Sequence, residues 1–511
     1  MYTIHAALPA GKRGENDLRQ GLAIIKLNGV RDSYRIFSVM PVRDATTGGG
    51  KHLEMPKDRP EATDPAVYSS AFQRFARERF PSSQQAWGNR AKDVAEILAL
   101  DAPKRDIENK TPRAEIDLVK AAGLLKIMGP KEYGGGGESW ETGYKCIREV
   151  AKGDASIGML LGYHLLWSTT ANVVGTEDQA TAIQQVILEN NWFIGGAVNP
   201  RDSDLKITSD GDNIVFNGFK NFNTGGVISD LTVLEGVFEG TEDHIFTLVK
   251  TDQPGMQFQH NWDSIGMRLT ESGSVRIDNI KVPWADALGW DPDTKRPTKD
   301  ILSVPFASML LPTIQLVFSN FYLGLAQGAL QAASKYTATQ TRPWPFGGDN
   351  KDQATDEWYI LERYGGFAAH LEAADALADR AGEKIARLYA DVGLHGSTIV
   401  GAGATNGHTN GHTNGTYSSI KLNRSAVTAR ARGEVAAYVA HFKVVATDTG
   451  LQVTSGIFEM LGARATGRKY LFDRFWRDLR THSLHDPVAY RRREVGRWQL
   501  LEEIPEVSWY T

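Results

Sequence analysis

The densest group of residues able to transfer protons is the segment RDLRTHSLHDPVAYRRREVG, residues 477–496. It contains His482 and His485, and Asp486 follows the second histidine. An imidazole suits acid–base chemistry because its ordinary pKa, about 6.5, lets the ring give and take protons near neutral pH. The segment is therefore either the reactive end of an active site or only the charged start of a last helix.

The dipeptide Asp486-Pro487 is typical of a helix N-cap followed by proline at the first helical position. We expect Asp486 to cap the helix VAYRRREVGRWQLLEE rather than to take part in catalysis. The positive end of that helix favours a neutral ring at His485, ready to accept a proton. The alternative is that His485 only packs in the bundle with a satisfied hydrogen bond, and His482 is expected to be structural.

Length and composition limit the classes of protein to consider. The 511 residues exceed what one compact core usually supports, so two or three domains are expected. A net charge of -4 provides no field that attracts nucleic acid or an anionic membrane surface. The single cysteine, Cys146, excludes an internal disulfide and a multi-thiolate metal site. Without a signal peptide or a long apolar run, a cytoplasmic protein is expected.

Hydrophobic periodicity divides the chain into four parts. Residues 1–66 show no sustained period and predict a poorly ordered N-terminal extension. Residues 67–191 place apolar side chains three and four apart, which indicates an N-terminal helical domain. The period changes to two over residues 192–300, which predicts a central β-domain with a hairpin turn at SDGD, 209–212. Helical periodicity returns over residues 301–511 and predicts a C-terminal helix bundle.

A low-complexity insert, GSTIVGAGATNGHTNGHTNGT, interrupts the bundle at residues 396–416. His408 and His412 could touch a metal, but the Gly, Asn and Thr around them cannot hold a rigid ligand shell. We expect a flexible surface loop and no metal site. No GxGxxG motif follows a strand and opens a helix, so no NAD(P)H site is predicted in this chain.

Four motifs in register with this order of elements resemble the acyl-CoA dehydrogenase superfamily. They are GLLKIMGPKEYGGGG (123–137), NGFKNFNTGG (217–226), DSIGMRLTESGSVRIDNIKVP (263–283) and TRPWPFGG (341–348). The resemblance covers roughly residues 68–505. It implies an α+β fold with an N-terminal helical domain, a central β-domain and a C-terminal helix bundle, assembled by family habit as a homotetramer.

The resemblance also implies a flavin site. Phe222 would flank the isoalloxazine ring, and Thr224 would hydrogen bond the flavin N5 edge. Arg342 and Phe346 match the spacing of an arginine and a phenylalanine that reach the flavin phosphates across a subunit interface. A guanidinium fork suits a phosphate dianion. The alternatives are an inward-facing strand aromatic at Phe222 and a simple surface residue at Arg342.

The substrate side is expected on the apolar segment ASIGMLLGYHLLWSTTANVV, residues 155–174. Tyr163 and His164 lie within it, and buried polar groups need partners. The resemblance implies that this helix lines the pocket over the flavin, so both are predicted pocket residues. A core histidine with an ordinary hydrogen bond is the alternative for His164. Trp262 and Arg268 are further candidates for lining the cavity.

The C-terminal motif departs from the dehydrogenases of this superfamily. Those enzymes commonly carry a glutamate base in a turn after an Arg-Asp pair. Here FDRFWRDLR (472–480) supplies the Arg-Asp pair, but the turn that follows is HSLHDP, without a glutamate. That turn and the GYH segment resemble the flavin-dependent monooxygenase branch of the same fold, of the dibenzothiophene monooxygenase type.

This resemblance implies a two-component monooxygenase that receives reduced FMN (FMNH2) from a separate NAD(P)H-dependent flavin reductase. O2 would add at flavin C4a, and the (hydro)peroxyflavin would transfer one oxygen atom to sulfur or nitrogen of a small organosulfur or amine substrate. His485 would act as the acid or base beside C4a. FMN rather than FAD rests on the resemblance alone. The alternatives are an FAD-dependent acyl-CoA dehydrogenase or oxidase with a relocated base, and a non-catalytic flavin-binding or scaffold protein.

Overall fold

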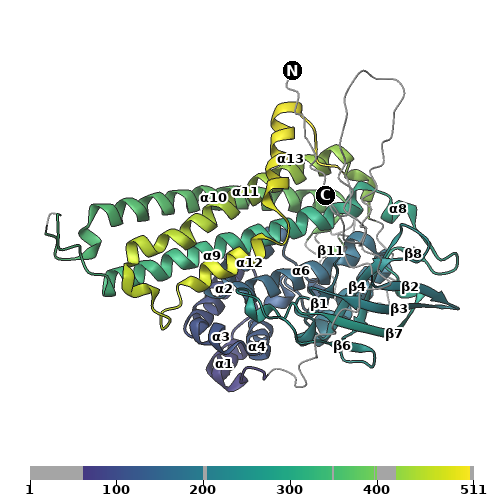
Figure 1. Cartoon of the computed structure of the whole chain (residues 1–511). Helices are drawn as coiled ribbons and strands as arrows, with labels where there is room; N and C mark the ends of the chain where they lie inside the picture. Colours follow the sequence, from purple (N-terminus) through teal and green to yellow (C-terminus); the bar gives the residue numbers. More distant parts are fainter. Residues whose placement is uncertain (1–60, 200–203, 348–349, 396–397, 400–421, 507–511) are drawn as a thin grey trace, which may run out of the picture. The chain divides into compact units, whose positions relative to one another are not determined.

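The computed structural model describes residues 61–199, 204–347, 350–395, 398–399 and 422–506. Along the chain, short and medium helices come first, strands follow, and long helices close the sequence (Figure 1). This order confirms the predicted α+β fold class. The predictions for residues 1–60, and for His408 and His412 in the insert, lie outside the described residues.

The N-terminal helices are α1 (Ser69–Arg77), α2 (Gln84–Ala99), α3 (Ala102–Glu108), α4 (Arg113–Ala121), α5 (Trp140–Gly153), α6 (Ala155–Val174) and α7 (Glu177–Asn190). Side-chain caps set several starts: Ser83 caps α2, and Thr176 forms a capping box with Gln179 at α7. Asn191 ends α7 in the left-handed conformation that asparagine tolerates. The predicted helical periodicity is thus realised in this region.

The prediction of a poorly ordered extension is wrong for residues 61–66. Thr63 donates its backbone N–H to the carbonyl of Thr111 at 3.0 Å. Its hydroxyl donates to Glu115 Oε2 at 2.6 Å. These bonds tie the segment to the start of α4. Local periodicity could not reveal them because the partners lie about fifty residues further along the chain.

The central strands are β1 (Ile194–Ala197), β2 (Lys206–Asp210), β3 (Asn213–Lys220), β4 (Leu231–Val237), β5 (His244–Lys250), β6 (Met256–Phe258) and β7 (Val275–Pro283). One sheet has the order β1-β4-β5 and the other the order β2-β3-β7-β6. Asp210 pairs with Asn213 across a turn in which Gly211 has a φ of 57°. The predicted hairpin is therefore confirmed. A short ladder, β8 (Trp290–Asp291) with β9 (Arg296–Pro297), follows.

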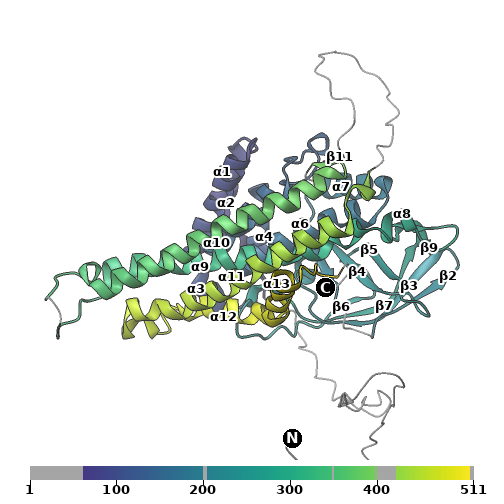
Figure 2. The same ribbon diagram turned by 90° about the horizontal axis from the view of Figure 1, so that it is seen from above.

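The C-terminal helices are α8 (Lys299–Leu302), α9 (Leu310–Gln340), α10 (Trp358–Asp391), α11 (Ala429–Leu461), α12 (Asp473–Ser483) and α13 (Val488–Leu501). Helices α9, α10 and α11 run alongside one another (Figure 2). The segment Pro305–Gln340 is long and apolar enough to cross a membrane, but 89% of its apolar window is buried in the protein. Within the insert, Thr398–Ile399 form β11, which pairs with β10 (Leu394–His395).

Helix α6 has no solvent-exposed face. All of its twenty residues are buried, and it packs against α5, α7, α9 and β1. A helix that is apolar on every side is stable only in the interior of a protein. Its first turn is capped by Asp154, which accepts a hydrogen bond from the backbone N–H of Ile157 at 3.2 Å. α6 therefore joins the N-terminal helices, the strands and the bundle.

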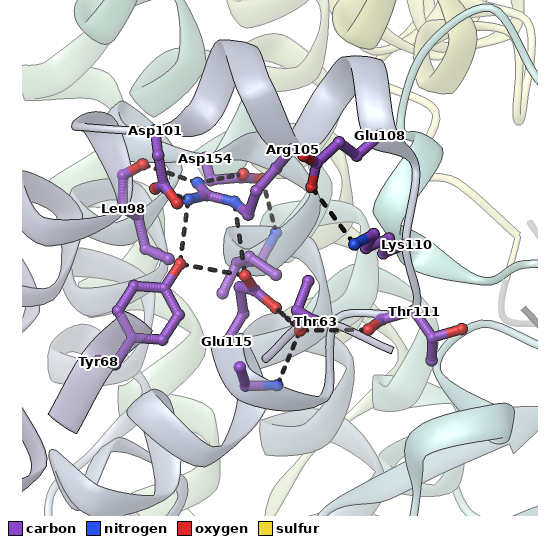
Figure 3. A network of polar contacts seen from close by, with 12 residues as sticks. Thr63, Tyr68, Leu98, Asp101, Arg105, Glu108, Lys110, Thr111, Glu115 and Asp154 are labelled. Atoms are coloured by element: carbon purple, nitrogen blue, oxygen red, sulfur yellow. Dashed lines mark hydrogen bonds and ion pairs between the residues drawn. The ribbon is translucent and has the colours of Figure 1, made fainter. Parts of the chain in front are cut away.

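A buried arginine fixes the start of α6 (Figure 3). Arg105 donates to Asp154 Oδ2 at 2.9 Å, to the Tyr68 hydroxyl at 3.1 Å and to the Leu98 carbonyl at 2.7 Å. It also pairs with Asp101. Burial opposes the charged guanidinium, but the neighbouring Asp154 and the other partners outweigh it and raise the pKa of Arg105. The network thus places two acidic partners, Asp101 and Asp154, against the buried charge.

Replacing Arg105 by methionine should lower the free energy of unfolding by about 3–5 kcal/mol, because Asp154 and its neighbours would be left buried without a counter-charge. Urea unfolding followed by circular dichroism measures the loss. Arg77→Met, at an exposed position of α1, is the matched control and should change the value by less than about 0.5 kcal/mol. A loss below about 1 kcal/mol for Arg105→Met would show that the network is not needed for stability.

Candidate active site

Helices α6, α9 and α12 bring an aromatic cluster to the predicted reactive turn. Phe318 of α9 lies at its centre, with its ring centroid 5.8 Å from that of Tyr163. The same ring lies 4.7 Å from His482 and 5.0 Å from His485. The two imidazoles stack on each other at 5.2 Å with an interplanar angle of 10°. The structure therefore unites two predicted site residues, Tyr163 and His485, that are more than three hundred positions apart in sequence.

His482 is the buried member of the histidine pair. Its Nδ1 lies 2.8 Å from the Tyr322 hydroxyl, which also lies 3.0 Å from the His482 carbonyl. Burial, followed by the nearby His485 and Lys443, holds the pKa of the His482 ring well below its usual range. His482 is therefore neutral at physiological pH and supports the ring stacked on it, which fits the structural role expected for it.

His485 is the solvent-accessible member, with 47% of its side chain exposed. It lies in the turn between α12 and α13, where its backbone N–H donates to the His482 carbonyl at 2.9 Å. Its Nδ1 lies 3.6 Å from Asp486 Oδ1. One edge of the ring is thus beside a carboxylate while the ring remains open to small molecules, which is the arrangement that proton exchange requires.

The predicted N-cap role of Asp486 is wrong. The residue before α13 is Pro487, and no side chain caps the helix. The Asp486 carboxylate accepts instead from Lys443 Nζ at 2.6 Å and from Arg491 Nε at 3.3 Å. Burial alone would raise the pKa of Asp486, but the adjacent His485 and the charge of Lys443 outweigh it and lower the pKa. Asp486 is therefore a fixed anion beside His485.

A chain of hydroxyl groups runs from Tyr163 into the β-domain. Tyr163 lies within hydrogen-bonding reach of Thr224, and burial raises the pKa of its phenol, so the hydroxyl keeps its proton. The Thr224 hydroxyl lies 2.9 Å from that of Ser272, which lies 2.7 Å from that of Thr270. The structure thus brings Tyr163 of α6 next to Thr224 of the β-domain, at one end of this row of hydroxyl groups.

Phe222 and Trp262 form an aromatic corner next to Thr224. Their rings are 6.3 Å apart in an edge-to-face arrangement. The Phe222 backbone has a φ of 57°, and 59% of the residue is exposed. A bulky residue in the left-handed region is strained, and such strain is found mainly at functional sites. The ring is therefore presented as an open apolar face.

The Arg-Asp pair of α12 anchors the loop that carries Trp262. Asp478 accepts from the Met267 N–H at 2.7 Å, and the carbonyl of Met267 accepts from Trp262 Nε1 at 2.9 Å. Arg477 donates to the carbonyl of Ile265 at 2.7 Å. The bundle thus fixes the indole that borders Phe222.

Arg268 lies on the same loop but in a different environment. Its side chain lines a small cavity with Asp106, Asp154 and Asp478. The expectation that Arg268 lines the flavin or substrate cavity is therefore corrected, since the side chain belongs to a charged cluster between helices. The sequence pattern could not distinguish these environments because the three acids come from distant segments.

His164 is a core residue, which corrects its prediction as a pocket residue. It is completely buried. Its Nε2 donates to the Leu125 carbonyl at 3.0 Å, while Nδ1 accepts from the Ile194 N–H at 3.1 Å. Burial lowers the pKa of the ring to about 4. Both nitrogens are engaged with the backbone, so the ring joins α6 to β1 instead of facing a ligand.

Arg342 and Phe346 lie apart from the aromatic cluster within the described chain. They follow the C-terminal end of α9, at the end of the bundle away from the β-domain (Figure 1). Arg342 is exposed, and Phe346 is 72% exposed with its ring 5.9 Å from that of Trp344. The structure does not bring these residues to Thr224 within one chain.

Several site residues were missed at the sequence level: Phe318, Lys443, Ser272 and Asn223. Lys443 could have been recognised from its place in HFKVVATDTG, where apolar residues surround a lysine at core spacing. Asn223 is 1% exposed, and both polar atoms of its carboxamide lack a partner among the described residues. Nothing in its local sequence indicates burial.

Two family models match the chain: "Acyl-CoA dehydrogenase, N-terminal domain" over residues 81–188 and "Acyl-CoA dehydrogenase, C-terminal domain" over residues 416–489. The dibenzothiophene monooxygenase of Rhodococcus erythropolis is 35% identical, and the match covers 81% of this chain and 93% of the relative. The chain therefore belongs to the acyl-CoA dehydrogenase family.

Further relatives lie on the monooxygenase side of the family. A probable FMNH2-dependent monooxygenase of Pseudomonas putida, SfnC, is 32% identical over 82% of this chain and 96% of its own. The FMN-bound structure of TdsC from Paenibacillus has a TM-score of 0.72 at 32% identity and covers 83% of this chain and all of the other. Together with the first relative, they confirm the predicted resemblance to the flavin-dependent monooxygenase branch.

The neutral, buried state of His164 predicts an acid-sensitive fold. Its pKa in the folded protein, about 4, is below the ordinary 6.5 of an unfolded chain. The stabilisation is therefore present above pH 6.5 and is lost as pH falls toward 4, with a slope of up to about 1.4 kcal/mol per pH unit. His164→Gln should make the pH dependence of urea unfolding shallower over this range. The exposed His370→Gln should not, and equal slopes would contradict the prediction.

Proposed function

We propose that this protein is the oxygenase of a two-component system that uses reduced FMN and O2 to oxygenate sulfur or nitrogen of a small organic substrate. The observation that carries this proposal is His485, which lies in the turn where the dehydrogenases carry a glutamate and stacks on His482 of α12. The overall reaction consumes O2, substrate and FMNH2. It yields the substrate with one added oxygen atom, water and oxidised FMN.

The described residues fit a flavin. Phe222 offers an open aromatic face, and Thr224 offers a hydroxyl beside it. The unpartnered carboxamide of Asn223 next to them is a buried donor and acceptor, the kind of group that a heterocycle with several polar atoms would satisfy. Arg342 is an exposed guanidinium suited to the phosphate of a flavin held by a neighbouring copy of the chain. Reduced FMN supplies the electrons that activate O2.

The side chains of this chain supply positioning, proton transfer and exclusion of water. Phe222 and Trp262 would hold the flavin ring through their aromatic side chains. Tyr163, kept protonated by burial, donates a hydrogen bond at the polar point that it shares with Thr224. His485 gives and takes the proton that accompanies oxygen transfer, with Asp486 beside its Nδ1. Phe318 and the neutral His482 are both buried and shield the inner face of the His485 ring from water, while the outer part of that ring stays exposed.

The proposed substrate class rests on the aromatic side chains around the candidate site and on the compounds named for the structural relatives. Aromatic rings of Tyr163, Trp167 and Phe318 border the cluster, which suits a small, mostly apolar compound. Structural relatives include indole-bound TdsC and the methanesulfinate monooxygenase MsuC of Pseudomonas fluorescens, with a TM-score of 0.73 at 30% identity. Organosulfur and amine compounds are the classes proposed here, with a separate NAD(P)H-dependent flavin reductase as partner.

The assembly and location follow the same proposal. An exposed Arg342 and Phe346 at the end of the bundle can complete a site only in another copy of the chain. This arrangement favours an oligomer, and we propose a homotetramer located in the cytoplasm. Sedimentation of the purified protein measures the oligomeric state directly.

Changing His485 to alanine should lower the rate of substrate oxygenation by about 100-fold, because general acid–base catalysis contributes at least this factor. The assay couples the protein to a flavin reductase, NADH and FMN with dibenzothiophene or indole as test substrate, and product is measured by chromatography. His370→Ala, exposed on α10, is the control and should retain full activity. Undiminished oxygenation in His485→Ala would remove His485 from the mechanism.

The competing acyl-CoA dehydrogenase function is tested with the protein loaded with FAD under anaerobic conditions. Acyl-CoA thioesters should leave the flavin absorbance unchanged, since the turn lacks a glutamate base. Bleaching of the flavin by a thioester would contradict the monooxygenase proposal. A protein that binds neither FMN nor FMNH2 would instead be a scaffold or binding protein.

Changing Arg342 to alanine should weaken FMN binding by about 10- to 100-fold, because a charge-assisted hydrogen bond to phosphate contributes about 1.5–3 kcal/mol. Fluorescence titration with FMN measures the affinity, and riboflavin, which has no phosphate, should bind the variant and the unaltered protein equally. Arg77→Ala on α1 is the control. Equal FMN affinity in the unaltered protein, Arg342→Ala and Arg77→Ala would show that Arg342 does not bind the phosphate.

A further inference from the structure

Lys443 is a buried cation on the core side of His482 and His485. It lies in the middle of α11 and is 1% exposed. Its Nζ donates to Asp486 Oδ1 and to Gln315 Oε1, both at 2.6 Å. The same Nζ lies 4.9 Å from the ring centroid of Phe318. Burying an ammonium group is costly, and well-packed apolar side chains often give equal stability, so packing alone does not explain this lysine.

Asp486 connects Lys443 to His485. The carboxylate oxygen that accepts from Lys443 is also the one 3.6 Å from His485 Nδ1. A carboxylate at this position favours a proton on Nδ1 and leaves Nε2 as the free, basic nitrogen. Stacking on His482 and contact with Phe318 restrict the plane of the ring. Lys443, Asp486 and His485 thus form a line from the interior of the bundle to the accessible turn.

We propose that Lys443, acting through Asp486, is a positioning residue that holds the His485 imidazole in the orientation and tautomer needed for proton transfer. This inference rests on the function proposed above for His485. Gln315 fixes the other side of the ammonium, so the ion pair has one geometry. Arg491 also binds Asp486: its Nε donates to Asp486 Oδ2 at 3.3 Å. This second contact is longer and cannot replace the buried lysine.

The charges around Lys443 give the arrangement a pH dependence. Asp486, Arg491 and Glu494 act on it from the turn and α13, and His482 faces it from α12. Burial lowers the pKa of Lys443 to about 8, although Asp486 opposes that shift. As pH rises through this value the ammonium becomes neutral and Asp486 loses its buried partner. We therefore expect the orientation of His485 to be maintained while Lys443 is charged and to relax as the pH rises above the pKa of Lys443, about 8.

The test compares Lys443→Met and Lys443→Arg with Lys335→Met, an exposed position on α9. In the coupled oxygenation assay, Lys443→Met should lower kcat by about tenfold while KM for substrate stays within about twofold, because only the acid–base step is affected. Lys443→Arg keeps its charge at high pH, so the decline in rate near pH 8 should move upward by at least one pH unit. Lys335→Met should match the unaltered protein. An unmoved alkaline decline in Lys443→Arg would overturn the proposal, whether or not Lys443→Met folds.

Crystal structures of the flavin-free protein and of Lys443→Met give a readout that does not depend on activity. In the variant the Asp486 carboxylate should turn to Arg491, and the His485 ring should leave its stack on His482. A ring that keeps its stack and its distance to Asp486 would overturn the proposal. If the unaltered protein oxygenates no substrate with FMNH2, the proposed function fails, while the crystal structures still decide whether Lys443 orients His485.

Discussion

The complete burial of α6 is the constraint on which the rest of this structure depends. Its twenty residues have no exposed face, so its polar groups depend on partners inside the protein. Asp154 at its start is held by Arg105, and His164 is held by two backbone groups. Each partner belongs to a different segment, so satisfying these polar groups also fixes the places of the N-terminal helices and β1 relative to α6.

The adjacent residues Tyr163 and His164 show how this constraint produces a site. Successive helical positions point about 100° apart. The His164 side chain is therefore directed to the backbone of β1, and the Tyr163 side chain to Phe318 and Thr224. Both ring nitrogens of His164 have hydrogen-bond partners in the backbone. The hydroxyl of the buried Tyr163 lies within hydrogen-bonding reach of Thr224, where the β-domain meets the bundle. The same apolar helix therefore stabilises the core and lines the candidate site.

Local patterns were sufficient to predict the order of elements, the Asp-Gly hairpin and the class of fold. They also predicted Tyr163, Thr224 and His485 as site residues. The structure places Tyr163 beside Thr224 and Phe318, and the Phe318 ring contacts His485, while the roles of these residues stay predictions. They failed for Asp486, whose local sequence is that of an N-cap. The buried Lys443, forty-three positions away, binds the carboxylate more strongly than a helix N-terminus would. The side chains of His164 and Arg268 could not be assigned for the same reason, since their environments are made of distant segments.

The electrostatics of Asp486 bear on why this turn suits oxygen transfer better than abstraction of a proton from carbon. The dehydrogenases of the family use a carboxylate base, and Asp486 is the acid that accompanies His485 in the corresponding turn. The adjacent His485, followed by Lys443 and Arg491, lowers the pKa of Asp486, so the carboxylate stays ionised and is a weak base. A base that removes a carbon-bound proton needs a raised pKa. Asp486 is therefore unsuited to that reaction, and His485 is the group in this turn that we propose exchanges a proton.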